Sequence, residues 1–176
     1  MTLNNTAGFP PLARAQELSE ALALDLLPRP LVVFNGCFDL LHAGHLQLLS
    51  YVNLAAMKGV RSTVVVLLDS DRLVRSTKGR DRPILTFAER AAALGTFPYI
   101  DYIIEIDGDK EFREVWKVLR PDIRVRGEEY KGKKSRVTCP ETIWVPKLSG
   151  LSTTEICRRV VEGWLDKKEA GESGVD

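Results

Sequence analysis

The sequence predicts an α/β fold with one doubly wound, mostly parallel sheet of five strands and helices on both faces. Two observations support this prediction. Short β-branched runs alternate with segments of helical periodicity, and strands that alternate with helices form parallel sheets through right-handed crossovers. The run at 62–68 is also almost continuously apolar, which is typical of a strand covered by helices on both faces.

Each strand is predicted from a short apolar run, and each helix from apolar residues spaced three or four positions apart. The predicted strands are Leu31–Phe34, Ser62–Leu68, Tyr102–Ile106, Ile123–Val125 and Thr142–Val145. The predicted helices after the first strand are Ala43–Lys58, Thr86–Phe97, Lys110–Leu119 and Thr153–Leu165. Thr86 is a good N-cap because Glu89 follows it at the capping-box position. An extra amphipathic helix, Ala13–Leu27, precedes the first strand and is ended by Pro28 and Pro30.

The chain is predicted to hold one main domain, because 176 residues are enough for a single substantial core. We expect a lead and outer helix over 1–28, the sheet domain over 29–166, and a flexible charged tail over 167–176. The order of elements is that of a Rossmann-like sheet. In such sheets ligands bind beyond the carboxyl ends of the strands, where the strand order reverses.

Composition excludes several classes of protein. With 25 basic and 24 acidic side chains the net charge is +1, so no overall attraction to nucleic acid or membrane is expected. The three cysteines form no C-x-x-C pair and the chain has two histidines, which argues against a His/Cys metal site or a disulfide framework. No apolar run could span a bilayer, and the first residues lack the layout of a signal peptide. We therefore expect a cytoplasmic protein.

The most informative stretch is 33–47, VFNGCFDLLHAGHLQ, where a predicted strand meets a predicted helix. Both histidines, His42 and His45, lie at the start of that helix. The first turn of a helix has unpaired backbone N–H groups and a partial positive charge, so it can bind an anion. Imidazoles three positions apart share a helix face, and Gly44 leaves room for a ligand to approach closely. The stretch therefore predicts a phosphate site that can stabilise negative charge in a transition state.

A second candidate anion site is GLSTTEICRR, at the start of the last predicted helix. Ser152, Thr153 and Thr154 place three hydroxyls beside free backbone donors, with Arg158 and Arg159 one turn further on. On its own this pattern is more typical of an ordinary N-cap.

Further cations and glycines follow other predicted strands. Lys78 precedes Gly79 in a polar segment that we expect to be a mobile loop, and a lysine there can reach a phosphate as a point charge. Arg90, on the next predicted helix, is either a phosphate contact or a solvated residue. Arg126 and Gly127 end the fourth strand before EEYKGKK, which is either a nucleotide or sugar contact loop or a charged surface loop.

The string GCFDLLHAGH resembles the H-x-G-H signature of the nucleotidyltransferase superfamily, which includes cytidylyltransferases and several adenylyltransferases. STT resembles the second signature of that family, which binds the triphosphate from the opposite side. The resemblance covers roughly residues 31–161. Within the superfamily, NGCFDLLHAGH, RGEEYKG, STTEI and KG followed by RP are most similar to the adenylyltransferase domain that activates heptose 1-phosphate.

The resemblance implies that a phosphate of the acceptor attacks the α-phosphorus of ATP and releases pyrophosphate. The implied acceptor is a sugar phosphate such as D-glycero-D-manno-heptose 1-phosphate. His42, His45 and Lys78 would stabilise the α-phosphate as catalytic residues. The other implied nucleotide-binding residues are Asn35, Gly36, Cys37, Phe38, Asp39, Gly44, Asp69, Arg90, Arg126, Gly127, Ser152, Thr153 and Thr154.

We expect Mg²⁺ to arrive with the triphosphate rather than in a protein cage, with Asp39, Asp69 and Asp71 as possible neighbours. The expected partners are therefore a nucleoside triphosphate and a phosphorylated small molecule. Neither a nucleic acid nor a membrane is expected as a partner, and the resemblance suggests a homodimer.

Two other functions remain open at this point. CTP-dependent cytidylyltransferases of the glycerol-3-phosphate type share both signatures. They usually have a threonine at the place of Cys37 and an arginine at the place of Pro98, which favours adenylyl transfer here. A nucleotide-binding regulator without turnover is the alternative from another class. The intact histidines, Lys78 and STT argue against it.

Overall fold

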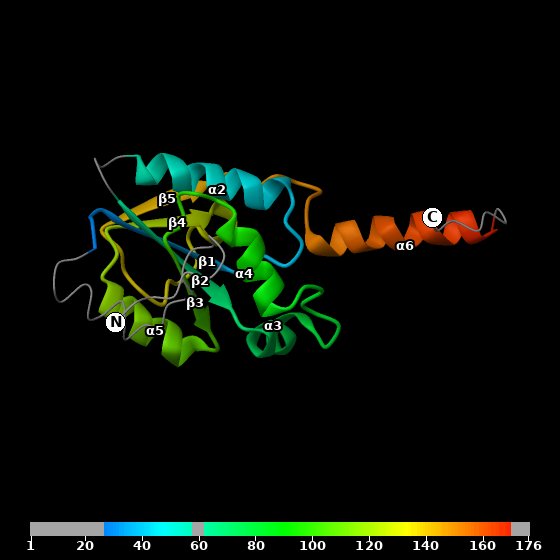
Figure 1. Ribbon diagram of the computed structural model, residues 1–176, viewed down its shortest axis with the longest axis horizontal. Coiled ribbons are helices and arrows are strands. Elements are labelled where there is room, and N and C mark those ends of the chain that lie inside the picture. Colours follow the sequence, from blue (N-terminus) through cyan, green and yellow to red (C-terminus); the bar gives the residue numbers. More distant parts are fainter. Residues whose placement is uncertain (1–26, 58–61, 170–176) are drawn as a thin grey trace.

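A computed structural model describes residues 27–57 and 62–169 of the chain (Figure 1). The predicted leading helix at 13–27 lies almost wholly outside these residues, as does most of the predicted tail. Within the described part, strands and helices alternate as the sequence predicts.

Five strands form one fully parallel sheet, which confirms the predicted fold class. They are β1 (Leu31–Gly36), β2 (Thr63–Asp69), β3 (Tyr102–Ile106), β4 (Ile123–Gly127) and β5 (Glu141–Val145). Their order in the sheet is β3-β2-β1-β4-β5. The chain therefore adds β2 and β3 on one side of β1 and then β4 and β5 on the other. The crevice expected at such a reversal lies between β1 and β4.

Four helices match the predicted ones, with ends that differ by a few residues. They are α2 (Ala43–Ala56), α4 (Phe87–Gly95), α5 (Asp109–Leu119) and α6 (Thr153–Glu169). A short 3-10 turn, Glu128–Tyr130, follows β4. The capping box at the start of α4 is present, because Thr86 and Glu89 each accept from the other's backbone N–H.

The prediction of a mobile loop around Lys78 is wrong, because this residue ends a helix, α3 (Asp71–Lys78). The segment DRLVRSTK is so polar that only Val74 is buried, which leaves almost no apolar periodicity to detect. Its start is nevertheless well capped, since the Ser70 hydroxyl accepts from the Leu73 N–H at 3.0 Å. Gly79 ends the helix with a φ of 106°, in the region that favours glycine.

Helices cover both faces of the sheet, as predicted (Figure 1). Side chains alternate along each strand, so neighbouring residues enter different cores. One core joins the sheet to α2 and α4 and contains Val32, Phe34, Val64, Val66, Leu49, Val52 and Leu94. The other joins the sheet to α5 and contains Leu31, Val33, Val65, Leu67, Phe112, Trp116 and Leu119.

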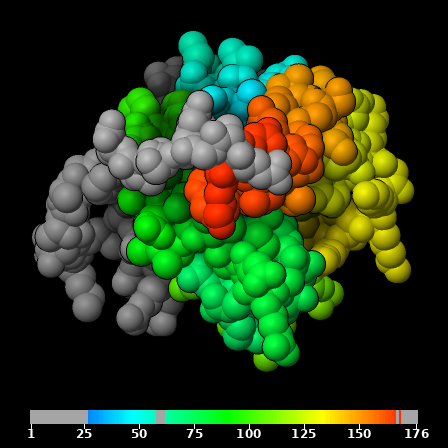
Figure 2. Space-filling model, turned by 90° about the vertical axis from the view of Figure 1, so that its right-hand side faces the viewer, coloured from blue at the N-terminus to red at the C-terminus, as the bar shows by residue number. Residues whose placement is uncertain are grey.

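Helix α6 extends away from the sheet in Figure 1, and Figure 2 views the molecule with this helix toward the reader. Its outer part exposes Val160, Val161 and Trp164. None of the helices within residues 27–57 and 62–169 is long and apolar enough to cross a membrane. The cytoplasmic location stays a prediction.

Candidate active site

One cavity of about 860 Å³ lies at the carboxyl edge of the sheet. The last residue of every strand lines it: Gly36, Asp69, Ile106, Gly127 and Val145. The residues predicted for the site that line this cavity are Asn35, Gly36, Cys37, Phe38, His42, Gly44, His45, Asp69, Lys78, Arg126 and Gly127. The fold therefore brings most of the predicted site together.

The two histidines lie side by side at the start of α2. His42 is the N-cap, and its Nδ1 accepts from the Gly44 N–H at 3.1 Å. The rings of His42 and His45 stack with their centroids 3.9 Å apart, and the Phe38 ring lies 5.1 Å from that of His45. A Cβ added to Gly44 would lie 3.0 Å from Cε1 of His42. The glycine thus makes room for the neighbouring imidazole as well as for a ligand.

Both imidazoles favour the neutral form. Burial, with help from the charge of Lys78, lowers the pKa of His42. Burial first and the charge of His42 second lower the pKa of His45 to about 4. The Nδ1 atom of His45 is buried without a hydrogen-bond partner among the described residues. An anion placed against these rings would offset their desolvation and accept hydrogen bonds from them.

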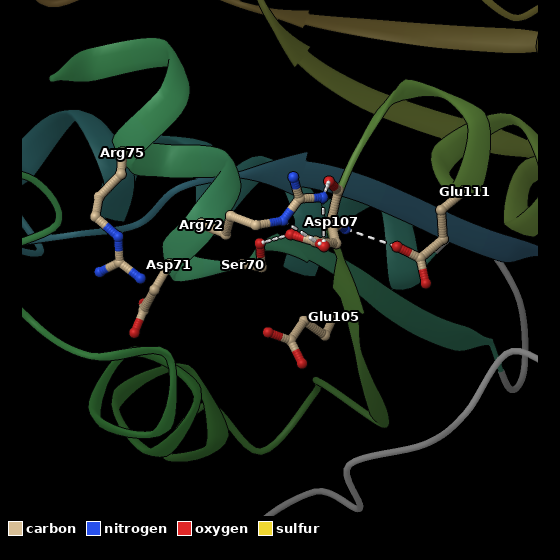
Figure 3. A pocket seen from close by; sticks show the side chains of 7 residues that line it. All are labelled: Ser70, Asp71, Arg72, Arg75, Glu105, Asp107 and Glu111. Carbon is tan, nitrogen blue, oxygen red and sulfur yellow. Dashed lines mark hydrogen bonds and ion pairs between the residues drawn. The ribbon is translucent and has the colours of Figure 1, made fainter. Parts of the chain in front are cut away.

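Lys78 lines the same cavity from the end of α3. The start of that helix is fixed to the end of β3 (Figure 3). There the Ser70 hydroxyl donates to Asp107, and Arg72 donates to the same carboxylate through Nε at 2.8 Å. These contacts lie beside a separate, smaller hollow. Anchoring α3 at its N-terminus determines where its last residue, Lys78, enters the cavity.

Arg90 does not line the cavity, although the sequence suggested a nucleotide contact or a solvated residue. Its side chain is fully buried. The guanidinium donates to the carbonyl oxygens of Cys37 at 2.5 Å, Asp69 at 2.8 Å and Leu85 at 3.1 Å, and it pairs with Asp71 at 2.9 Å. Arg90 therefore joins the ends of β1 and β2 from behind the cavity.

Asp39 also lies behind the cavity wall, with 1% of its surface exposed. Its carboxylate accepts from the N–H groups of Ile84 and Leu85, both at 2.9 Å, and from Arg82 Nε at 2.6 Å. Burial opposes ionisation, but these hydrogen bonds outweigh it and lower the pKa of Asp39. Asp39 thus fixes the segment between α3 and α4 against the H-x-G-H stretch.

Ser152, Thr153 and Thr154 begin α6 and do not line the cavity, although Leu151 directly before them does. Ser152 caps the helix, since its Oγ accepts from the Glu155 N–H at 3.1 Å. Thr153 is buried. Thr154 Oγ1 accepts from Arg82 Nη1 at 3.4 Å, and this links α6 to Asp39. Arg82 therefore connects the STT segment to the H-x-G-H stretch, because it bonds both Thr154 and Asp39.

The sequence interpretation missed Arg124, the second residue of β4, which lines the cavity. A signal was present. The strand IRVRG places an arginine between Ile123 and Val125, both of which are buried in the core. A charged residue at a covered strand position points to a special environment. Arg136, also missed, lines the cavity and pairs with Asp109 at the start of α5.

The described residues contain no group of three histidine, cysteine, aspartate or glutamate side chains placed to hold a metal ion. Of the three possible magnesium neighbours, Asp69 lines the cavity and Asp39 and Asp71 do not. Burial raises the pKa of Asp69. A cation beside this carboxylate would favour its charged form, so Asp69 fits one contact to a metal held chiefly by phosphates.

The fold and the cavity define the class of protein first: a Rossmann-like α/β protein with a histidine-lined ligand site at its strand ends. A family model described as cytidylyltransferase-like matches residues 33–159, so the chain belongs to that family. This confirms the resemblance to nucleotidyltransferases.

Two relatives with assigned names are similar to this chain. The chain is 40% identical over 140 residues to a D-beta-D-heptose 1-phosphate adenylyltransferase from Bordetella bronchiseptica, covering 79% of this chain and 80% of the relative. It is 37% identical over 147 residues to the bifunctional protein HldE from Campylobacter fetus, covering 81% of this chain and 30% of HldE. The chain therefore spans only a minor part of HldE's length.

The fold is similar to that of a lipopolysaccharide core biosynthesis protein from Thermoplasma volcanium, whose crystal structure is known. The TM-score is 0.52 at 21% identity, over 68% of this chain and 98% of the other. This likeness supports the fold alone.

Proposed function

We propose that the protein is an adenylyltransferase that joins AMP from ATP to a sugar phosphate and releases pyrophosphate. The main observation is the stacked pair His42 and His45 with Lys78, which line one cavity at the ends of all five strands. Neutral imidazoles at the start of one helix and an ammonium at the end of another suit a triphosphate better than a metal or a covalent intermediate.

The proposed reaction needs no protein nucleophile. An oxygen of the acceptor phosphate attacks the α-phosphorus of ATP and forms the new P–O bond, while the bond to the pyrophosphate oxygen breaks. The attacking group is already an anion, so the protein has mainly to align the reactants and stabilise the charge on the α-phosphate. His42, His45 and Lys78 would do this.

The remaining residues would bind the nucleotide around this centre. Gly44 and Gly36 let phosphates and ribose approach the backbone, and Arg126 and Gly127 border the cavity at the end of β4. Ser152, Thr153 and Thr154 would bind the β- and γ-phosphates from the start of α6. Mg²⁺ would neutralise phosphate charge when bound with the triphosphate, and Asp69, which lines the cavity, would contact it.

The names of the relatives support ATP and a heptose phosphate as substrates, because one is a D-beta-D-heptose 1-phosphate adenylyltransferase at 40% identity. Cys37, at the exit of β1, also differs from the threonine usual in the cytidylyl branch. The acceptor that we propose is accordingly D-beta-D-heptose 1-phosphate or a close analogue.

Pyrophosphate release tests the proposal. The four nucleoside triphosphates are crossed with D-beta-D-heptose 1-phosphate, other sugar 1-phosphates and glycerol 3-phosphate, with Mg²⁺ present. We expect turnover with ATP and the heptose phosphate. Turnover only with CTP and glycerol 3-phosphate would replace this function by the cytidylyl one. Thermal protection by ATP without any pyrophosphate release would indicate a nucleotide-binding regulator.

A further inference from the structure

Arg124 occupies an unusual position for a charged side chain. It is the second residue of β4, and 6% of its surface is exposed. Its neighbours Ile123 and Val125 enter the core beneath α2, so Arg124 faces the opposite side, toward α5. There its guanidinium lies 5.0 Å from the Trp116 ring centroid and 6.0 Å from that of Phe112.

The hydrogen bonds of Arg124 leave its charge unpaired. Nη1 donates to Ser135 Oγ and Nη2 donates to Asn35 Oδ1, both at 3.2 Å, and both acceptors are neutral. Nε is buried without a partner among the described residues. Within residues 27–57 and 62–169 Arg124 forms no ion pair with a carboxylate. Burial, with a smaller effect from Arg126, lowers the pKa of Arg124 to about 10. The surroundings therefore disfavour the charged guanidinium relative to water.

Arg90 shows what a buried structural arginine looks like in the same molecule. Its Nε and both terminal nitrogens donate to carbonyl or carboxylate oxygens, and one of them pairs with Asp71. It does not line the cavity. Arg124 differs on each count, because it is unpaired and lines the cavity. Among the described residues, Arg124 therefore has a charge without a carboxylate partner, at the wall of the cavity.

The surroundings favour an anion. Arg126, Lys133 and Lys134 line the same cavity, as does Arg136, which pairs with Asp109. The other carboxylates there belong to Asp69 and Glu129, so the cations outnumber the acids. The stacked histidines lie at the start of α2, whereas Arg124 packs against α5 on the other face of the sheet. Arg124 is also two residues, roughly 7 Å, further from the strand end than Arg126. An anion there would lie deeper than one held at the strand exits.

We propose that Arg124, with Asn35 beside it, binds an oxyanion of the acceptor substrate in a subsite on the α5 side of the cavity. This inference rests on the proposed function, because it assumes a phosphorylated acceptor. The oxyanion is either the phosphate that reacts or a second acidic group of the acceptor. Arg124 is then a residue that positions and selects the acceptor, while His42 and His45 act on the nucleotide.

A purely structural arginine would behave differently. If Arg124 only stacked on Trp116, Arg124→Leu would lower the thermal stability and leave acceptor binding unchanged. Our proposal requires the reverse. Replacing an unpaired buried cation by an apolar residue keeps or raises stability. Losing a charge-assisted hydrogen bond then weakens acceptor binding by on the order of 10- to 100-fold.

The first test measures binding and does not need turnover. The full chain is saturated with α,β-methylene-ATP, and inorganic phosphate is titrated by calorimetry into wild type, Arg124→Leu, Arg124→Lys and Lys117→Leu. Lys117 is exposed on α5 and its replacement removes the same charge outside the cavity. We expect binding by wild type and Lys117→Leu, a loss of about tenfold or more in Arg124→Leu, and an intermediate affinity in Arg124→Lys. Equal phosphate affinity in all four proteins would overturn the proposal.

The second test measures kinetics. We expect Arg124→Leu to raise the KM for D-beta-D-heptose 1-phosphate while the KM for ATP stays within about twofold of wild type. An increase for every sugar phosphate assigns Arg124 to the reacting phosphate. An increase confined to acceptors with a second acidic group assigns it to that group. An unchanged acceptor KM, or equal increases for both substrates, would refute the inference.

If wild type turns over no acceptor, the proposed function fails, and calorimetry alone decides the role of Arg124. If Arg124→Leu does not fold, Arg124→Lys replaces it in both tests.

Discussion

The rings of His42 and His45 stack across the first turn of α2 with their centroids 3.9 Å apart and their planes inclined by 24°. Two imidazoles this close cannot both be charged without repulsion, and burial already disfavours the charge. Both rings therefore favour the neutral form in the free protein. The pair is arranged so that a bound anion, rather than the protein itself, would favour protonation.

His45→Ala tests the catalytic role of this pair. Removing one donor from a site that stabilises transition-state charge typically lowers the rate by on the order of 10²–10³-fold. We expect that loss in pyrophosphate release, with the far-UV spectrum and cooperative unfolding retained. Leu54→Ala, at an exposed position of the same helix, is the control and should keep full activity. Near-normal turnover by His45→Ala would show that the assignment is wrong.

Nucleotide binding should raise the pKa of both histidines. In the free protein burial lowers both values, that of His45 to about 4. A triphosphate next to the rings favours imidazolium, so both values should move upward on binding. The chain has two histidines, so ¹H–¹⁵N NMR of tag-free protein resolves them without ambiguity. Unchanged titration curves in the presence of saturating α,β-methylene-ATP would place the nucleotide elsewhere.

The same depressed pKa predicts a pH dependence of stability. Between pH 6.5 and about 4 the unfolded chain protonates His45 whereas the folded chain does not. The unfolded state then binds more protons, so the free energy of unfolding falls as the pH falls through this window. Urea unfolding inside and above the window measures the slope. His45→Ala should have a shallower slope than wild type, and identical slopes would contradict the burial of this imidazole.

Gly44→Ala separates helix stability from site geometry. Alanine favours a helix by up to about 1 kcal/mol, so the fold should remain stable. The new Cβ would meet the His42 ring at 3.0 Å and must displace it by a few tenths of an ångström. We expect kcat/KM to fall on the order of tenfold, less than the 10²-fold cost of a 1 Å displacement. Gly163→Ala, where the added Cβ meets nothing within 4 Å, should leave kcat/KM unchanged.

Asp39 is predicted to be important for folding. Asp39→Ala would remove the partner of Arg82, whose side chain is 86% covered, and would also remove the acceptor of the part-buried N–H groups of Ile84 and Leu85. Breaking such a pair costs about 3 kcal/mol or more, measured by urea unfolding. Glu162→Ala breaks the exposed pair with Arg158 and should scarcely change stability. Equal losses in the two variants would refute the importance of burial here.

Much of the fold could be predicted from the sequence because its strands are apolar and its helices periodic. The predicted strand Ser62–Leu68 is β2, Thr63–Asp69, almost residue for residue, since a strand covered on both faces has little freedom in composition. Helix α3 was the exception. Its eight residues bury Val74 alone, so capping by Ser70 and the tie to Asp107 determine it, and both depend on the strand next to it.

The candidate site divides in the same way. His42, Gly44 and His45 lie within four consecutive residues, so their spacing alone places them at one helix turn. Arg90 and Arg124 could not be assigned so easily. Each is an arginine near apolar residues. Only the fold shows that every nitrogen of the Arg90 guanidinium donates to a carbonyl oxygen, whereas Arg124 donates to two neutral side-chain oxygens and lines the cavity.

The cap of α2 has one more consequence. Because Nδ1 of His42 accepts from the Gly44 N–H, the neutral ring must carry its hydrogen on Nε2. The tautomer is thus selected by the backbone before any ligand arrives. Full protonation of His42 would cost the helix this side-chain cap, so the imidazole is better suited to sharing a proton through Nε2 than to shuttling one through both nitrogens.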